Sequence, residues 1–289
     1  MVSITPQLVR SLIEQQFPQW ARLPIVPVEP GGWDNRTFRL GDALAVRLPS
    51  AECYAEQIKK ERQWLPWFAP QVPLAVPTPL ELGNPGAGYP WHWSIHRWIE
   101  GEPVSSTSST DLGTLARDLA NFLAKLQSVD ATNGPAPGAH NFHRGGALAV
   151  YDEQTRRAIA ALTREIDASR ATQVWDEALS SSWDRTPVWM HGDVAAGNLL
   201  LRNGRLHAVI DFGCCAVGDP ACDLVAFWTI FDASSADVFK EALQLDRATW
   251  QRARGWAIWK ALITLIDDRR EDLRTTDRTR SLIARIIPA

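Results

Sequence analysis

The sequence lacks the features that mark membrane-spanning and nucleic-acid-binding proteins. No apolar run in its 289 residues approaches the roughly 20 residues that cross a bilayer. Its formal net charge is −3, so it has no excess of Lys and Arg for binding phosphate backbones. The N-terminus, MVSITPQLVR, lacks the basic and then apolar segments of a signal peptide. We therefore expect a cytoplasmic protein with neither a membrane nor a nucleic-acid partner.

Cysteine is also scarce, whereas tryptophan is abundant. The four cysteines have no zinc-site spacing and fit a reducing compartment: Cys53, Cys214, Cys215 and Cys222. We expect Cys214 and Cys215 to be buried and inert. Most of the 14 tryptophans should belong to the core, although a few could line a ligand pocket. The content of 45% hydrophobic and 22% charged residues is that of a globular protein with one large or two modest domains.

The most informative segment is residues 190–213, MHGDVAAGNLLLRNGRLHAVIDFG. Asp193 and Asn198 form a D-x-x-x-x-N unit, which supplies a carboxylate to accept a proton and an amide oxygen for a metal ion. Asp211 opens an I-D-F-G string, where a second carboxylate can hold Mg²⁺ against nucleotide phosphates. Each of these three residues, taken alone, could instead be a helix cap or a turn residue. Together they predict a phosphoryl-transfer site.

A predicted hairpin explains how the two metal ligands meet. The Asn203-Gly204 pair separates two apolar runs, and such a pair favours a two-residue turn because both positions need positive φ. Folding back at this turn would bring Asn198 and Asp211 together. Both could then hold one cation.

The motifs resemble those of the aminoglycoside phosphotransferase family of small-molecule kinases, which is similar to protein kinases in fold. The pattern is H-G-D-x-x-x-x-N-L-L and then I-D-F-G-x-x-x-x-G-D-P-A-x-D-L. The matching residues are His191, Gly192, Asp193, Asn198, Asp211, Phe212, Gly213, Gly218, Asp219, Pro220, Ala221, Asp223 and Leu224. Val194-Ala195-Ala196 departs from the family's usual His or Gln with Pro, and it leaves the ligand positions intact.

This resemblance implies a two-lobed, protein-kinase-like α+β fold. The N-lobe would be an antiparallel sheet plus a helix, spanning residues 1–102 and binding the nucleotide. The C-lobe, residues 103–289, would be mainly helical and would hold the catalytic and substrate sites. The implied activity is transfer of the γ-phosphoryl group of ATP or GTP, with Mg²⁺, to a hydroxyl of a small acceptor. A nucleotide-binding pseudokinase with a scaffold or regulatory role is the alternative.

The N-terminal part contains candidate phosphate-binding residues. Strongly alternating residues at 36–40 and 43–48 predict two strands with a turn between them. The preceding segment includes Gly31, Gly32 and Asn35, where a kinase-like fold covers the triphosphate with backbone amides. An ordinary hairpin explains the same residues locally.

Arg47 occupies the position of the lysine in the protein-kinase V-A-I-K pattern. Its guanidinium group can bind phosphate or carboxylate through two donors, although a surface arginine on an edge strand is the alternative. A helix is predicted at about residues 53–68, and Glu61 lies on its apolar stripe. We expect Glu61 to orient Arg47, with Glu56 and Glu52 as alternatives.

An expected connection between the lobes follows the N-terminal sheet. Residues 91–99 predict a strand, and the resemblance implies that the backbone of Arg97, Trp98 and Ile99 meets the nucleotide base. Residues 105–110 predict a polar linker before the helical part of the chain.

Other polar residues have more open interpretations. We expect His191 to orient the catalytic loop and Asp223 to support it through hydrogen bonds. His143 and Arg144 could bind substrate or phosphate, or simply be solvated loop residues. Five acidic residues could either form a pocket for a cationic amino sugar or lie on solvated helix faces: Asp232, Asp237, Glu241, Asp267 and Asp268. The acceptor stays open among aminoglycosides, macrolides, metabolic alcohols and sugar amines.

Overall fold

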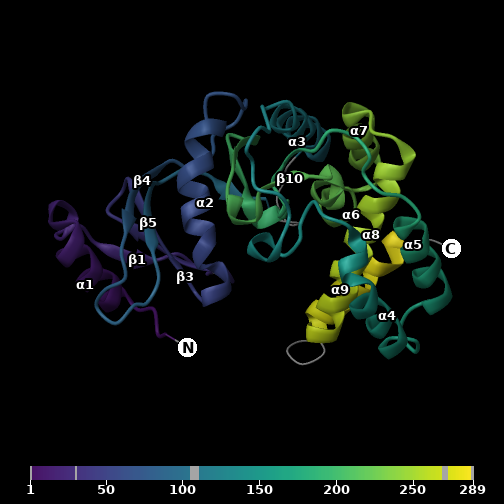
Figure 1. Cartoon of the computed structure of the whole chain (residues 1–289), viewed down its shortest axis with the longest axis horizontal. Coiled ribbons are helices and arrows are strands. Elements are labelled where there is room, and N and C mark those ends of the chain that lie inside the picture. The colour runs from purple at the N-terminus through teal and green to yellow at the C-terminus, as the bar shows by residue number, and fades with distance from the viewer. Residues whose placement is uncertain (1, 30, 105–110, 269–272, 288–289) are drawn as a thin grey trace.

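The computed structural model describes residues 2–29, 31–104, 111–268 and 273–287. Figure 1 shows an antiparallel sheet with two flanking helices at one end of the molecule and a mainly helical body at the other. The predicted α+β fold class is confirmed. The linker predicted at residues 105–110 lies outside the described residues. Within them, no helix is long and apolar enough to cross a membrane.

The N-terminal sheet has five antiparallel strands in the order β1-β2-β3-β5-β4. The strands are β1 (Ile25–Pro27), β2 (Asn35–Leu40), β3 (Leu44–Pro49), β4 (Pro79–Gly83) and β5 (Trp93–Arg97). Gly41 has a φ of +59° in the turn between β2 and β3, which glycine adopts without steric cost. Pro79 lies in edge strand β4, where its missing N–H removes no central ladder bond.

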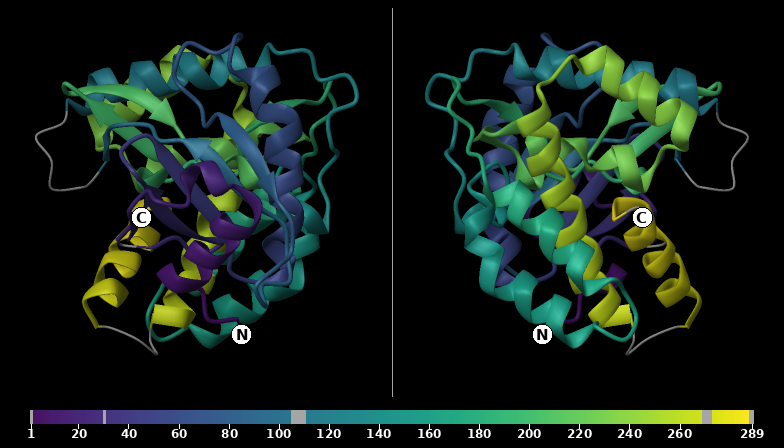
Figure 2. Two further views of the ribbon diagram at one scale, coloured as in Figure 1. Left: turned by 90° about the vertical axis from the view of Figure 1, so that its left-hand side faces the viewer. Right: turned by 90° about the vertical axis from the view of Figure 1, so that its right-hand side faces the viewer.

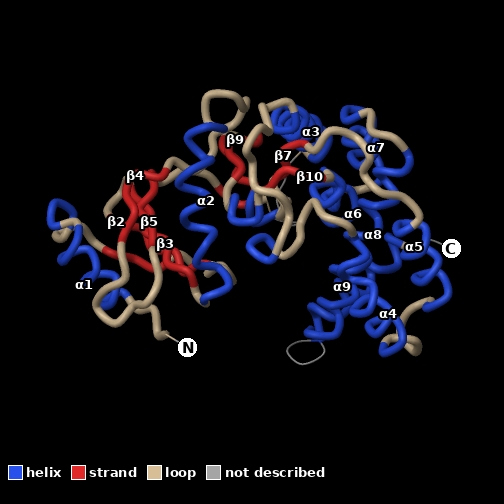
Figure 3. The backbone as a smooth tube through the Cα atoms, viewed as in Figure 1, coloured by secondary structure: helices blue, strands red, loops and turns tan. Residues whose placement is uncertain are grey.

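Alternation along these strands gives the sheet two different faces. Val46 of β3 pairs with Ile95 of β5, and both pack in a small hydrophobic core against helix α1 (Pro6–Gln16). Arg47 pairs with Ser94 on the opposite face, which faces helix α2 (Glu52–Phe68). Helix α2 lies between the sheet and the rest of the molecule (Figure 3), so the sheet face that carries the buried Arg47 is turned toward the rest of the molecule.

Helix α2 connects the two parts of the molecule. Its C-terminal residues Leu65 and Phe68 belong to the large hydrophobic core rather than to the small one beneath α1. The Phe68 ring lies 4.7 Å from Trp189 and 5.7 Å from Phe212, measured between centroids. Packing of α2 therefore fixes the sheet against the segment that carries Asp211.

The remaining strands form two small sheets around the predicted catalytic segment. Strands β8 (Leu199–Arg202) and β9 (Arg205–Val209) form the predicted hairpin, with φ values of 53° and 74° at Asn203 and Gly204. Strand β6 (Glu102–Pro103) pairs with β8, and β7 (Val188–Met190) pairs with β10 (Ala216–Gly218).

The helical body faces the viewer in the right-hand panel of Figure 2. Its helices are α3 (Leu112–Gln127), α4 (Asp152–Ala161), α5 (Ala168–Leu179), α6 (Ala226–Thr229), α7 (Ala233–Leu243), α8 (Arg247–Asp268) and α9 (Leu273–Ile286). The sequence predicts helices near residues 152–168 and 171–180, and both inner boundaries are wrong. Helix α4 ends at Ala161, and α5 begins at Ala168. The cause is Asp167, whose carboxylate accepts a hydrogen bond from the Arg170 N–H and so caps α5.

Candidate active site

The loop that carries Asp193 is held by a buried carboxylate. Asp223 accepts hydrogen bonds from the backbone N–H groups of His191 and Gly192, each at 2.7 Å. Burial raises the pKa of Asp223, and the two backbone donors oppose this effect by favouring its charged form. The predicted supporting role of Asp223 is thus a direct pair of hydrogen bonds.

His191 fixes the same loop from its other side. Its Nε2 lies 3.0 Å from the carbonyl oxygen of Ile210, and its Nδ1 accepts a hydrogen bond of 3.2 Å from the Asp193 N–H. This pattern requires the neutral tautomer with the proton on Nε2. Glycine at position 192 is favoured by its φ of +85° and also by the limited space, because a Cβ there would lie 2.5 Å from the carbonyl oxygen of Cys214.

Asp193 and the hairpin residue Asn198 are in direct contact. The Nδ2 group of Asn198 donates to the backbone oxygen of Asp193 at 2.9 Å and to its Oδ2 at 3.2 Å. The Ile210 N–H donates to the carbonyl oxygen of Asn198 at 2.9 Å. Asp211, the next residue, therefore lies beside Asn198, and the hairpin brings together the segments that carry the three polar residues.

The buried cation of the N-terminal sheet reaches this cluster. Arg47 donates to Glu61 Oε2 at 2.5 Å and to Asp211 Oδ1 at 2.9 Å. Burial opposes the charge of Arg47, but the two carboxylates outweigh it and raise the pKa. Glu61 is only 1% exposed, whereas the alternatives Glu52 and Glu56 are exposed. The structure therefore places Arg47, Glu61 and Asp211 in one ion-pair network.

The oxygens available beside Asp193 fit a magnesium ion. Among the described residues, neither Asn198 Oδ1 nor Asp211 Oδ2 has a hydrogen-bond partner. Carboxylate and amide oxygens are hard ligands that Mg²⁺ accepts. The described residues contain no group of three or more His, Cys, Asp or Glu side chains that could form a metal site by themselves. Phosphate oxygens and water would have to complete the coordination, as is usual for Mg²⁺ bound with a nucleotide.

The glycine-containing segment before β2 also approaches the cluster. Asn35 is 4% exposed, and neither polar atom of its side chain has a partner among the described residues. The neighbouring Asp34 accepts a hydrogen bond from Gln57 at 3.1 Å. Burial, with smaller contributions from Asp211 and Asp193, raises the pKa of Asp34. A hydroxylated or phosphorylated ligand would give Asn35 its missing hydrogen bonds, whereas Gly31 and Gly32 remain exposed.

The predicted base-contact segment begins at Arg97, the last residue of β5, and continues beyond the strand. The Arg97 N–H donates to the carbonyl oxygen of Thr78 at 3.0 Å, and the Trp98 N–H donates to the carbonyl oxygen of Ala43 at 2.8 Å. These donors are therefore already engaged. Ile99 has no backbone hydrogen bond within the described residues, so its peptide groups remain available to a ligand.

Two residues near the cluster were missed by the sequence analysis. Asp34 lies in the glycine-containing segment before β2, and its approach to Asp193 and Asp211 depends on tertiary folding, which no local pattern indicates. His96 is 2% exposed on the same face of β5 as Ser94, and its Nδ1 has no partner among the described residues. Burial, followed by Arg47, lowers its pKa well below 6.5. The alternation S-I-H in β5 was the available signal, because it puts His96 on the face of Arg47.

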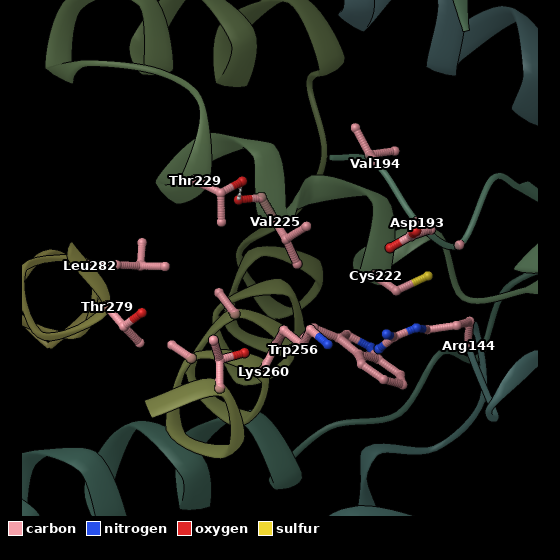
Figure 4. Close-up of a pocket in the computed structure, with 14 residues that line it drawn as sticks. Arg144, Asp193, Val194, Cys222, Val225, Thr229, Trp256, Lys260, Thr279 and Leu282 are labelled. Carbon is pink, nitrogen blue, oxygen red and sulfur yellow. Dashed lines mark hydrogen bonds between the residues drawn. The ribbon is translucent and has the colours of Figure 1, made fainter. Parts of the chain in front are cut away.

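A solvent-open pocket with a cavity volume of about 110 Å³ begins at Asp193 (Figure 4). Arg144 and Cys222 lie near Asp193, and Trp256 and Lys260 of α8 line the pocket farther away. The acidic residues considered for an acceptor pocket, Asp232, Asp237, Glu241, Asp267 and Asp268, do not line it. Asp232 instead caps α7, and Asp268 accepts a hydrogen bond from Thr279. These contacts indicate that Asp232 and Asp268 do not form an acceptor pocket.

Comparison with known proteins agrees with this geometry. The profile of the phosphotransferase enzyme family matches residues 25–256. The uncharacterized protein YcbJ of Bacillus subtilis (strain 168) is 25% identical over 169 residues, which are 55% of this chain and 50% of that protein. The alignment thus spans about half the length of this curated relative.

Solved structures with the same fold include aminoglycoside and macrolide phosphotransferases. The GDP and kanamycin complex of APH(2")-IIia superposes with a TM-score of 0.74 at 18% identity, covering 96% of this chain and 97% of that one. The apoenzyme of macrolide 2'-phosphotransferase MphH from Brachybacterium faecium has a TM-score of 0.62 at 20% identity, covering 96% and 98%. At these identities the likeness establishes the kinase-like fold.

Proposed function

This chain belongs to the phosphotransferase enzyme family, and we propose that it transfers the γ-phosphoryl group of ATP or GTP to a hydroxyl of a small molecule. The observation that carries the proposal is the contact of Asn198 with Asp193, together with the backbone bond that places Asn198 beside Asp211. Several solved relatives were captured with nucleotides or antibiotics, including one with GDP and kanamycin and one with streptomycin and ATP. These complexes support a nucleotide as phosphoryl donor here.

Asp193 is the proposed catalytic residue. Its carboxylate accepts the proton of the acceptor hydroxyl while the hydroxyl oxygen forms a bond to the γ-phosphorus. The bond from that phosphorus to the β,γ-bridging oxygen breaks, and the nucleoside diphosphate leaves with the bonding electrons. The backbone bonds around His191 and Gly192 keep Asp193 in place, so that little rearrangement is needed for reaction.

The remaining site residues are proposed to position the nucleotide. Asn198 and Asp211 would hold Mg²⁺, which supplies positive charge to the phosphate oxygens. Arg47, oriented by Glu61, would bind the α- and β-phosphates. The segment with Gly31, Gly32 and Asn35 would cover the triphosphate, and the backbone of Arg97, Trp98 and Ile99 would lie against the base.

The same proposal divides the chain into a nucleotide-binding part, residues 1–102, and a catalytic and acceptor-binding part, residues 103–289. It also places the reaction in the cytoplasm, where nucleoside triphosphates are available. The chain's free cysteines are compatible with that compartment. Burial raises the pKa of Cys215 to about 12, which keeps this thiol protonated beside the site.

A coupled assay of nucleoside diphosphate release tests the proposal. Purified protein is mixed with ATP or GTP, Mg²⁺ and a panel of hydroxylated acceptors, and phosphorylated products are identified by mass spectrometry. We expect release that depends on both Mg²⁺ and acceptor. Nucleotide binding without acceptor-dependent release would instead favour the pseudokinase alternative, which no observation on the described residues supports.

A further inference from the structure

The pocket beside Asp193 contains two cations without an acidic partner. Arg144 is half-buried, and its side chain has no ion pair or hydrogen bond with another described residue. Lys260 of α8 is exposed and has no ion pair within the described part of the chain. Of the described residues that line the pocket, Asp193 is the only acidic one. The pocket therefore has more positive than negative side chains.

Arg144 is held rigidly despite lacking a charged partner. Its guanidinium carbon lies 4.8 Å from the ring centroid of Trp259 and 5.4 Å from that of Trp256. The fully buried Asn141 donates to the carbonyl oxygens of Arg144, at 2.9 Å, and Cys214, at 3.2 Å. The Arg144 backbone is thereby tied to the segment that follows Asp211. A guanidinium group that lies over aromatic rings keeps its in-plane donors available for a carboxylate.

Helix α8 supplies the remaining part of the pocket. Trp256, Lys260 and Thr264 follow at intervals of four residues, so they share one helix face. Val225 and Leu282 add apolar surface on the side away from Arg144 (Figure 4). Trp256 is almost fully buried beneath Arg144, so the surface open to a ligand combines two positive groups with an aliphatic wall.

We propose that the acceptor of this enzyme is a hydroxylated carboxylic acid rather than a polycationic amino sugar. Arg144 and Lys260 bind its carboxylate, its carbon skeleton lies against the partly exposed Val225, and its hydroxyl group faces Asp193. The proposal rests on the phosphotransferase function proposed above. A polycation such as an aminoglycoside would instead meet two like charges, and among the described lining residues Asp193 is the one carboxylate that could offset them.

Matched acceptors provide the test. Each set has one hydroxylated skeleton that carries a carboxylate, a carboxamide or an amine at the same carbon, as in uronic acids, uronamides and amino sugars. Kanamycin and a neutral macrolide are included. The readouts are Mg²⁺-nucleotide Kd, without acceptor, and kcat/KM for phosphoryl transfer. Loss of a charge-assisted hydrogen bond predicts at least about a tenfold lower kcat/KM for the carboxamide than for the carboxylate, and a lower value still for the amine.

Variants show whether the two cations cause this preference. Arg144→Gln and, separately, Lys260→Gln should lower kcat/KM for the carboxylate about tenfold while changing the carboxamide value little. Both should leave the Kd of the Mg²⁺-nucleotide unchanged. Lys125→Gln, on the exposed surface of α3, is the matched control, and it should change neither kcat/KM nor the Kd of the Mg²⁺-nucleotide. Lys260 is exposed, so its variant tests the inference even if Arg144→Gln does not fold.

The outcomes separate the substrate class from the enzymatic function. Preferred transfer to amines or kanamycin, or equal use of carboxylate and carboxamide, overturns the acid-acceptor inference and leaves the phosphotransferase proposal intact. Nucleotide binding without transfer to any member of the panel also counts against the acid acceptor. A weaker nucleotide Kd in both cationic variants would show that Arg144 and Lys260 bind phosphate instead. Absence of nucleotide binding by the wild-type protein would remove the proposed function and the inference together.

Discussion

Replacement of Arg47 by methionine separates the structural role of its ion pair from its proposed role in nucleotide binding. Arg47 donates a hydrogen bond of 2.5 Å to Glu61 Oε2, and Glu61 is 1% exposed. The other oxygen of Glu61, Oε1, already has no hydrogen-bond partner among the described residues. Arg47→Met leaves this carboxylate buried without a hydrogen bond. Breaking one partner of a buried ion pair costs about 3–5 kcal/mol, whereas the 31%-exposed side chain of Asp211 can regain water and should add little.

The double variant Arg47→Met/Glu61→Leu removes both charges. It should recover most of the lost free energy of unfolding, because the uncompensated carboxylate is gone. Equilibrium urea denaturation of wild type, single and double variants measures this recovery. Nucleotide affinity, measured by calorimetry, should stay low in both variants. The reasoning about burial would be refuted if Arg47→Met lowered the free energy of unfolding by less than about 1 kcal/mol, or if the double variant recovered none of the lost free energy.

Three other substitutions test separate contacts. His96→Gln tests pH dependence: since the pKa of buried His96 is lowered well below 6.5, the unfolded chain binds the proton more readily. The free energy of unfolding of wild type should then fall as pH drops below 6.5, by up to about 1.4 kcal/mol per pH unit from this group, and urea titrations should show a smaller slope for the variant. Gly192→Ala should lower both turnover and Tm, because its Cβ would lie 2.5 Å from Cys214 O, and unchanged kinetics would contradict that crowding. Asn35→Leu should leave stability equal or up to about 1 kcal/mol higher, since it removes unpartnered buried polar atoms, while nucleotide affinity falls; unaltered affinity would exclude Asn35 from the nucleotide site.

The parts of the site that the sequence predicted are those specified by short-range chemistry. Asn203-Gly204 formed the expected turn because both residues adopt positive φ. Asp111 is likewise a residue type that caps helices, and it caps α3 by accepting a hydrogen bond from the Thr114 N–H. The partnership of Arg47 with Glu61 was also predictable, because Glu61 lies on the apolar stripe of α2.

The parts that were missed depend on contacts between distant segments. Arg47 and Asp211 lie 164 positions apart, and local patterns did not indicate their direct hydrogen bond. The position of Arg144 over Trp256 and Trp259 likewise joins a loop to α8, and local patterns did not indicate this contact. The two tryptophans themselves are buried in the core, as the sequence predicted for most tryptophans. The start of α5 does not depend on such distant contacts. It could have been predicted from the sequence, because Asp167 is a residue type that commonly caps helices.

Rapid-quench measurement of a single turnover in Asp193→Asn tests the central claim most directly. The nearly isosteric amide keeps the loop geometry but cannot take the acceptor proton, so the transfer rate should fall about 10²- to 10⁴-fold while the Kd of the Mg²⁺-nucleotide stays unchanged. Asp184→Asn, at an exposed position outside the site, is the charge-matched control and should transfer at the wild-type rate. A rate for Asp193→Asn equal to that of this control would contradict the assignment of Asp193 as the proton acceptor.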